Sequence, residues 1–279
     1  MLNQLVEKIY SFDKDKAVED ILDIYKKQWY CIVNFLYFFN LLKFLEKQIW
    51  WEKYYNALLN SDLILPDWIA LRLYLKRKFW KKVYNLNGTD FVPYFFDEIL
   101  KKIWRKSEEK SKNNFEKYNL RQKNFFSTNF LDQSSNNSYS VFIYWAKKEV
   151  IKKVYEKYKD RRNIMYSQDW YSNFNWDKIS LDFFRTSSDV LPILLVWLWT
   201  PKQEIWIMNN LDKIKKYWFI VFWVWWLFDF LAWEEKRAPE IVRKLNLERL
   251  WRMVSNPKKN FKKWLWSLKV FKYLLIWRG

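Results

Sequence analysis

The segment VLPILLVWLWTPKQEIWIMNNLDKIKKYWFIVFW, residues 190–223, contains the pattern that decides the fold. Apolar runs at 190–196 and 217–223 are short and rich in branched and aromatic residues, which is typical of buried strands. The residues between them, 203–216, have the spacing of a helix. A strand, a helix and a second strand in this order predict part of a parallel sheet.

The same alternation extends toward the N-terminus. A strand-like run at 139–145 precedes a helical pattern at 146–159, and a charged opening with an amphipathic helical pattern occupies 1–28. Three further segments each combine a strand with a helix: 30–45, 60–79 with a Pro66–Asp67 turn, and 81–104 with a turn at Gly88. We therefore predict an α/β fold, a Rossmann-like mostly parallel sheet flanked by helices.

The chain of 279 residues is long enough for one large domain with an appendage. We expect the α/β domain to span 1–235, with residues 105–138 as an exposed polar insertion. Residues 236–279 carry 13 Lys and Arg against two acidic residues, and thus 11 of the chain's net charge of +19. Aromatic residues interleave with these bases, which predicts a basic, amphipathic helical appendage.

The composition excludes several kinds of active site. The chain has no histidine, which rules out a histidine general base, a histidine-bearing triad and a histidine-ligated metal. Its single cysteine, Cys31, rules out an intrachain disulfide and a cysteine-cluster zinc site, and it suits a reducing compartment. The strongest candidate for a membrane span, 218–233, contains Asp229 and is shorter than the ~20 residues that a crossing helix needs. A buried strand and turn are the better interpretation there.

Tryptophan and glycine occur in unusual numbers, 21 and two respectively. Glycine ordinarily makes up about 7% of a protein, or roughly 20 residues at this length. An α/β protein needs glycine where φ is positive or where a ligand approaches the backbone. The excess of tryptophan is close to the deficit of glycine.

Three segments carry a family resemblance: ILLVWLWTPKQEIWI (193–207), IVFWVWWLFDFLAWEEKRAPEIVRKLNLERLWRMVSNPKK (220–259), and LILPDWIALRLY (63–74) followed by NGTDF (87–91). Together they resemble the WecG/TagA/CpsF family of bacterial glycosyltransferases, glycosyltransferase family 26. That family typically shows V-G-L-G-x-P-K-Q-E, then G-V-G-G-x-F-D-F-x-A-G, then K-R-A-P. Its N-terminal half carries a Pro/Ala-Asp-Gly motif and a G-[ST]-D motif. The resemblance covers residues 30–100 and 139–263 and leaves the insertion unmatched.

Seven glycines of these family motifs read tryptophan in this chain: Trp68, Trp197, Trp199, Trp223, Trp225, Trp226 and Trp233. Tryptophan does not readily adopt a positive φ, and it blocks the approach of a phosphate to the backbone. Our hypothesis is that UGA codons, which the source organism reads as glycine, are written here as tryptophan. A genuinely tryptophan-rich chain is the alternative. We expect a few tryptophans to be genuine under either view, such as Trp206, which matches a position where the family itself often has tryptophan.

The resemblance implies inverting sugar transfer with Asp67 as the catalytic base, since Asp67 matches the aspartate of the family's Asp-Gly motif. Such transfer needs a base for the acceptor hydroxyl and cationic or amide groups for the departing nucleotide diphosphate. Without histidine, we expect a carboxylate to be the base. Asp67 also follows a strand-like run, at the edge where α/β sheets place their sites. Taken alone, Pro66–Asp67 is typical of a turn with an N-cap aspartate.

The N-terminal motifs also indicate substrate contacts. Three residues open a helix, where backbone N–H groups suit an anion or sugar hydroxyls and equally suit a capping motif: Gly88, Thr89 and Asp90. Asn34 matches an early asparagine of the family. Two departures weaken these contacts, because Asn85 replaces an arginine of many relatives and Ile32 replaces the usual threonine.

The C-terminal motifs supply further candidates. Three of them follow a strand and would contact the sugar nucleotide if positions 197 and 199 are glycine: Thr200, Gln203 and Glu204. Asp229 matches the family's F-D-F aspartate, with bonding of loop amides as the alternative. Arg237 and Arg252 match family arginines, whose guanidinium groups bind diphosphates without a metal. A solvated basic face is the alternative for these arginines, and Arg249 replaces a family tryptophan.

The resemblance thus implies a metal-independent, UDP-sugar-dependent hexosyltransferase that needs no cofactor. Its partners would be a nucleotide-sugar donor and a polyprenyl-diphosphate-linked acceptor for cell-surface polysaccharide or teichoic-acid-type synthesis. The basic segment 236–279 predicts docking on an anionic membrane surface, so we expect a cytoplasmic protein, peripheral on the inner face of the cell membrane. We expect no nucleic-acid partner, and a homo-oligomer stays open.

Two alternatives remain. One is a basic membrane- or nucleic-acid-associated protein without enzymatic activity, which charge and aromatic content support. The other is an inactive member of the family, which genuine tryptophans at the glycine positions would enforce.

Overall fold

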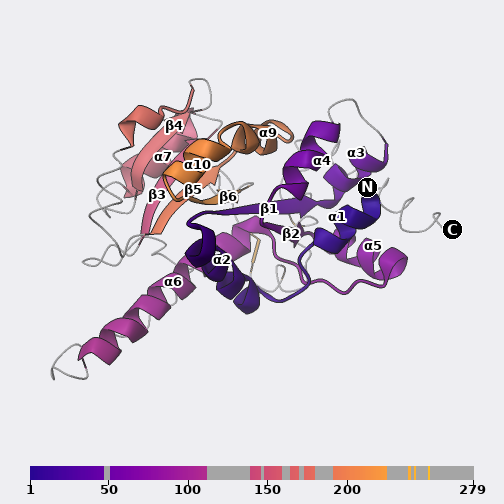
Figure 1. Ribbon diagram of the computed structural model, residues 1–279, viewed down its shortest axis with the longest axis horizontal. Helices are drawn as coiled ribbons and strands as arrows, with labels where there is room; N and C mark the ends of the chain where they lie inside the picture. Colours follow the sequence, from indigo (N-terminus) through magenta and orange to yellow (C-terminus); the bar gives the residue numbers. More distant parts are fainter. Residues whose placement is uncertain are drawn as a thin grey trace.

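The computed structural model describes residues 1–46, 51–111, 139–145, 148–158, 164–169, 173–179 and 191–224, with single positions at 238, 239, 242 and 251. These residues form a six-stranded sheet of order β2-β1-β6-β5-β3-β4, in which every neighbouring pair is parallel. The strands are β1 (Cys31–Tyr37), β2 (Leu63–Asp67), β3 (Tyr139–Trp145), β4 (Ile164–Asp169), β5 (Leu191–Val196) and β6 (Ile220–Trp223). The predicted parallel α/β fold is confirmed (Figure 1).

The central strands are apolar along most of their length because helices cover both faces of the sheet. β5 reads LPILLV and β6 reads IVFW, and every residue of the two except Leu191 is buried. β1 reads CIVNFLY and is buried up to its last residue. The three runs at 31–37, 191–196 and 220–223 therefore meet in the middle of the sheet.

The helices divide between the two faces of the sheet. They are α1 (Leu2–Lys8), α2 (Lys14–Gln28), α3 (Phe38–Leu45), α4 (Trp51–Leu59), α5 (Ile69–Phe79), α6 (Gly88–Ser111), α7 (Lys148–Tyr158), η2 (Trp176–Lys178), α9 (Lys202–Asn209) and α10 (Leu211–Lys216). α2, α6 and α7 contribute to one hydrophobic cluster with alternate residues of the central strands. On the other face, α1, α3, α4 and α5 cover β1 and β2, while α9 and α10 cover β5 and β6.

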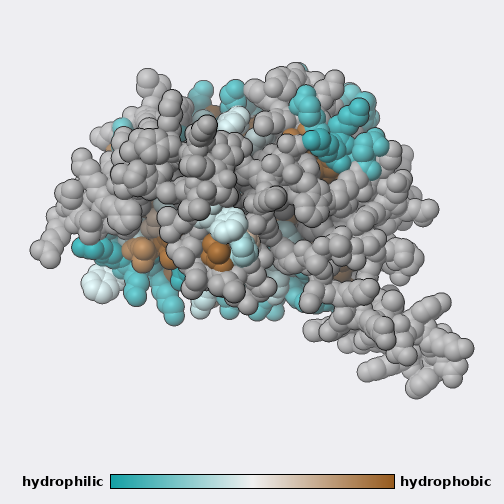
Figure 2. All heavy atoms as spheres, turned by 180° about the vertical axis from the view of Figure 1, so that it is seen from behind, coloured by the Kyte–Doolittle hydropathy of each residue, from teal (hydrophilic) through white to brown (hydrophobic). Residues whose placement is uncertain are grey.

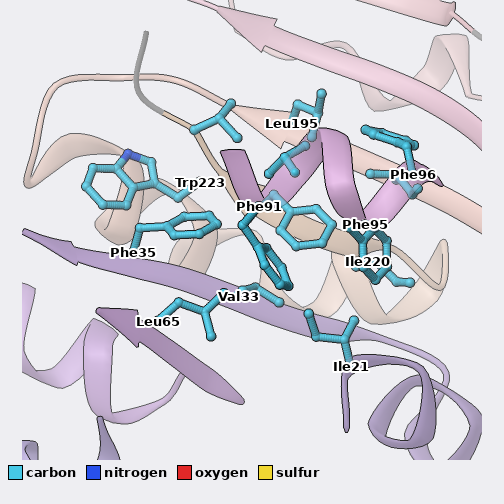
Figure 3. Packing of buried hydrophobic residues seen from close by; sticks show 14 of the residues in the cluster. Ile21, Val33, Phe35, Leu65, Phe91, Phe95, Phe96, Leu195, Ile220 and Trp223 are labelled. Carbon is cyan, nitrogen blue, oxygen red and sulfur yellow. The ribbon is translucent and has the colours of Figure 1, made fainter. Parts of the chain in front are cut away.

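Aromatic side chains of α6 fill the core beneath the centre of the sheet. Figure 3 shows Phe91 and Phe95 of α6 lying among residues of β1 and β6. The rings of Phe95 and Phe222 meet edge to face with their centroids 4.8 Å apart. Burial of one such side chain stabilises the fold by about 1.5–3 kcal/mol. In the space-filling view, hydrophobic residues of the described part appear as a few small patches (Figure 2).

The strand predicted within 81–104 is wrong. Residues 81–87 are irregular, and helix α6 begins directly at Gly88. A single backbone hydrogen bond, from Leu86 N–H to the carbonyl oxygen of Pro66 (2.9 Å), connects this segment to β2. The predicted turn at Gly88 is thus the first residue of the helix.

Two other elements differ from the sequence-based expectation. β4 was not predicted, since half of its residues, IMYSQD, are polar; it lies at the edge of the sheet and pairs with β3. The single helix expected over 203–216 is two helices, α9 and α10, that meet at Asn210. Asn210 uses its side chain to accept from Trp176 Nε1 (3.1 Å) and to donate to the carbonyl of Trp206 (2.9 Å).

Part of the predicted domain organisation falls outside the described residues. α6 runs through the start of the polar insertion to Ser111, and residues 112–138 are not described. Of the basic appendage 236–279, only four single positions are described. Within the ranges that the structure describes, no helix is long and apolar enough to cross a membrane.

Candidate active site

The candidate site lies at the carboxyl-terminal edge of the sheet, where β1 and β2 end side by side. Tyr37 of β1 pairs in register with Asp67, the last residue of β2. Asp67 is only partly buried, unlike the four residues before it in the strand. Open parallel sheets bind ligands at their carboxyl-terminal edge, and Asp67, the predicted catalytic residue, lies at this edge.

The loop before α6 is held against the end of β2. Trp68 N–H donates to Asn85 Oδ1 (2.8 Å), and Leu86 N–H donates to the carbonyl of Pro66 (2.9 Å). These two bonds flank Asp67 and bring the start of α6 beside it. Asn85, which replaces the arginine of many relatives, therefore ties the loop to the strand in this chain.

Asn87 caps the helix that opens with the three predicted contact residues. Its Oδ1 accepts from Asp90 N–H (3.0 Å) and from the Thr89 hydroxyl (2.7 Å), and its Nδ2 donates to Asp90 Oδ2 (2.8 Å). A Cβ at Gly88 would lie 3.4 Å from the ring of Phe35, at ordinary van der Waals contact, so Gly88 packs directly on the core. The capping interpretation of this motif is what the structure displays.

Gln203 lies in the interior, on the first turn of α9. It is completely buried, and its Oε1 accepts from Leu198 N–H (3.2 Å). Its Nε2 donates to Thr200 Oγ1 (2.8 Å) and to Glu204 Oε1 (2.9 Å). The amide predicted to contact substrate thus holds the loop that follows β5 in shape.

Glu204 is a fully buried carboxyl group next to Gln203. Its Oε1 accepts from Thr200 Oγ1 (3.2 Å) and from Gln203, whereas its Oε2 has no hydrogen-bond partner among the described residues. Burial raises the pKa of Glu204 to about 7, against the opposing effects of these hydrogen bonds and of the Lys43 charge. At neutral pH the protonated and ionised forms are therefore both populated.

Helix α3 connects the part of the site around Asp67 with the part around Thr200. Its first residues follow β1, and the ring of Phe39 stacks on Trp68 with centroids 5.7 Å apart. Farther along the helix, Asn40 Nδ2 donates to Thr200 Oγ1 at 3.5 Å. Sequence analysis missed Asn40, whose signal is a buried polar residue in the apolar helix FFNLLKFL.

Asn34 lies apart from this edge. It sits in the middle of β1, is 1% exposed, and donates from Nδ2 to Ser61 Oγ, whose hydroxyl donates to the carbonyl of Ala57 (2.9 Å). The structure therefore does not bring Asn34 together with Asp67. In this chain its amide joins β1 to the end of α4.

Indole rings occupy the edge of the sheet in the chain as written. Trp197 directly follows β5 and contacts Trp199, with ring centroids 5.6 Å apart. Trp223 ends β6 and is buried, as is Trp197. If these positions are glycine, the edge beside Thr200 loses three large side chains.

The remaining candidates lie outside the described residues: Asp229, Arg237 and Arg252, together with Trp225, Trp226 and Trp233. Their predicted roles stay predictions. Among the residues that the structure does describe, no three Asp, Glu or Cys side chains gather as ligands for a metal ion.

A comparison with known proteins identifies the family to which this chain belongs. Residues 125–279 match the profile of the glycosyl transferase WecG/TagA/CpsF family, and no match was found among curated proteins. The matched range contains β3 to β6 and the 200–204 loop, whereas Asp67 and the start of α6 precede it. Since the match covers more than half of the chain, the chain belongs to the WecG/TagA/CpsF family of glycosyl transferases.

Proposed function

We propose that this glycosyl transferase inverts the anomeric centre of the sugar it transfers, with Asp67 as the base. Membership of the family supports a role in the synthesis of cell-surface polysaccharide. The donor in this proposal is a nucleotide-diphosphate sugar, such as a UDP-linked N-acetylmannosamine, and the acceptor is a polyprenyl-diphosphate-linked sugar of polysaccharide or teichoic-acid-type synthesis. The observation that carries the proposal is the partly exposed carboxylate of Asp67 at the carboxyl end of β2, beside the start of α6.

The chemistry is a single displacement. The Asp67 carboxylate accepts the proton of the acceptor hydroxyl while that oxygen attacks the anomeric carbon of the donor sugar. The bond from this carbon to the diphosphate breaks, and its electron pair leaves with the nucleotide diphosphate. Attack on the face opposite the leaving group inverts the anomeric centre.

The leaving diphosphate gains negative charge and needs positive groups around it. The N-terminus of α6 provides the positive end of a helix dipole near Asp67. In the proposal, Arg237 and Arg252 supply the remaining charge as bidentate donors, without a metal ion.

A comparison of Asp67, which ends β2, with Asp62, which directly precedes β2, tests the role of Asp67. The assay uses the chain with glycine at positions 68, 197, 199, 223, 225, 226 and 233, which we call the glycine-restored chain. Asp67→Asn is expected to lower kcat about 10²–10⁴-fold with donor binding retained, because the variant lacks a base. Sugar transfer is followed by release of the nucleoside diphosphate.

Asp62→Asn is the matched control, because Asp62 directly precedes the first residue of the same strand. Asp62 accepts from Ile32 N–H (2.7 Å) and from Gln28 Nε2 (2.8 Å), so its role is structural. This variant is expected to lose stability and to keep kcat. Full activity of Asp67→Asn would remove Asp67 from the role of base.

Attachment to the inner face of the cell membrane is part of the proposal. The segment 236–279 carries 11 net positive charges interleaved with aromatic residues. Each Lys or Arg near an anionic lipid surface contributes about 1 kcal/mol of attraction. The acceptor, held in the membrane by its polyprenyl chain, would thereby meet the carboxyl edge of the sheet.

Flotation with vesicles that contain an anionic lipid tests this attachment. The full chain is expected to float with the vesicles, and a chain that ends at 235 is expected to stay at the bottom, because the positive segment is lost. RNA binding is measured on both chains. Flotation that survives the truncation, with loss of RNA binding instead, would favour the nucleic-acid-associated alternative.

A further inference from the structure

All non-glycine residues with a positive φ in the described part of the chain are tryptophans. They are Trp29 (φ 64°), Trp68 (φ 86°), Trp80 (φ 54°) and Trp218 (φ 56°). Tryptophan makes up 21 of 279 residues, so four residues drawn at random would rarely all be tryptophan. For a bulky side chain this backbone region is strained, and glycine, followed by asparagine and aspartate, is the usual occupant.

Two of these residues end helices in the manner of a C-terminal glycine. Trp29 follows α2 with φ 64° and ψ 17°, and its N–H donates to the carbonyl of Tyr25. Trp80 follows α5 with φ 54° and ψ 17°, and its N–H donates to Leu75, as does the N–H of Lys81. A left-handed residue at this position ends a third to a half of helices, and it is usually glycine.

The other two residues, Trp218 and Trp68, also have a positive φ but lie in loops of other kinds. Trp218 comes shortly after α10, and the N–H of the next residue, Phe219, bonds back to the carbonyl of Ile214 (3.1 Å). Trp68 joins β2 to α5 with φ 86° and ψ 143°, outside the left-handed helical region and in space that glycine dominates.

Burial of the indole rings does not offset the backbone strain at the two helix ends, because the side chains of Trp29 and Trp80 are exposed. The side chain of Trp80 is 91% exposed and that of Trp29 is 57% exposed. Trp176 and Trp206, by contrast, have ordinary backbone angles and stack on each other with centroids 6.0 Å apart. Four described tryptophans thus have the backbone geometry of glycine, whereas Trp176 and Trp206 pack as large side chains on an ordinary backbone.

We infer that this protein carries glycine at positions 29, 68, 80 and 218, and that the codon there is UGA, read as glycine. Positions 29, 80 and 218 lie outside the family motifs, so the backbone supports the recoding independently of the family resemblance. The inference also does not rest on the proposed sugar transfer.

Position 68 gives the inference a consequence for the site. The indole there stacks on Phe39 and lies 5.4 Å from Tyr37, centroid to centroid, directly after Asp67. Glycine at this position removes the indole and leaves an aromatic surface, formed by the two neighbouring rings, beside the carboxylate.

The coding sequence and the mass of the protein provide the first test. We expect UGA codons at positions 29, 68, 80 and 218 and UGG codons at positions 176 and 206. In peptides of the protein purified from its own source, the four positions are expected to have the mass of glycine. UGG codons, or tryptophan masses at these four positions, would overturn the inference.

Three variants of the chain as written provide the second test. Trp80→Gly is expected to raise the Tm about 2–4 °C above that of Trp80→Ala, because both remove the exposed indole and glycine alone removes the Cβ. Trp206→Gly, in which a packed ring is lost, is expected to lower the Tm. Equal Tm values for Trp80→Gly and Trp80→Ala would contradict a glycine backbone at this position.

Discussion

Glu204 has an environment that makes the stability of the fold depend on pH. Its carboxyl group is completely buried on α9, and the neighbouring charged or titratable groups include Lys43 of α3 and Tyr54 of α4. Burial raises its pKa from 4.5 to about 7, so the folded chain holds this proton more tightly than the unfolded chain. The stability that this group contributes is complete below pH 4.5 and is lost as the pH rises through about 7.

Glu204→Gln is expected to remove this pH dependence, because the amide stays neutral. At pH 8 the free energy of unfolding of the variant is expected to exceed that of the parent by up to about 3 kcal/mol. At pH 5 the free energy of unfolding of the variant is expected to be similar to that of the parent or lower. Urea unfolding at both pH values measures the difference. Glu52→Gln, on the exposed side of α4, is the control for loss of a negative charge. A constant difference between Glu204→Gln and the parent at the two pH values would contradict the burial argument.

At the scale of residues, some of the site could be predicted from sequence. Asp67 and the group at 88–90 stand in recognisable motifs, and both lie at the predicted edge of the sheet. Asn40 could not be predicted, since its contact with Thr200 joins residues 160 positions apart. The hydrogen bonds of Gln203 are local, to Leu198, Thr200 and Glu204, but its complete burial depends on tertiary packing, which the local sequence does not reveal.

Among the helices, α6 has the clearest link between local sequence and the site. Asn87 caps its N-terminus and orders the backbone N–H groups near Asp67. Asp13 caps α2 in the same way, accepting from Lys16 N–H (3.0 Å), far along the chain from the site.

The two capping residues give a matched pair of variants. Asn87→Ala and Asp13→Ala are each expected to lower the free energy of unfolding by about 1 kcal/mol, because each leaves a helix N–H without its side-chain partner. Only Asn87→Ala is also expected to slow transfer, since α6 begins beside Asp67. Urea unfolding and the transfer assay on the glycine-restored chain measure both effects. An equal loss of transfer in the two variants would argue against a role of α6 in the site.

The elements that sequence analysis predicted best are those in which local pattern and burial agree. β5 and β6 are continuous apolar runs covered on both faces, and the alternation of strand and helix around them is confirmed. β4 was not predicted because an edge strand with polar residues resembles a loop in sequence. A strand was wrongly predicted at 81–87 because the apolar residues of this segment, Val83 and Leu86, are buried without pairing as a strand.

At the scale of the whole molecule, the sheet joins the two halves of the sequence. The family profile matches 125–279, while Asp67 lies on β2 in the first half. β1 links them, because it pairs with β2 on one side and with β6 on the other, Cys31 lying opposite Ile220. The order of strands thus places the matched half and the proposed base on one continuous edge.

Sugar transfer by the glycine-restored chain is the measurement that tests the central claim most directly. The chain is mixed with a panel of nucleotide-diphosphate sugars and a polyprenyl-diphosphate-linked acceptor, and release of the nucleoside diphosphate is followed. We predict release with one donor of the panel, only when acceptor is present, with inversion at the anomeric carbon and with loss of activity in Asp67→Asn. Retention of the anomeric configuration, or the same rate in Asp67→Asn, would contradict the account.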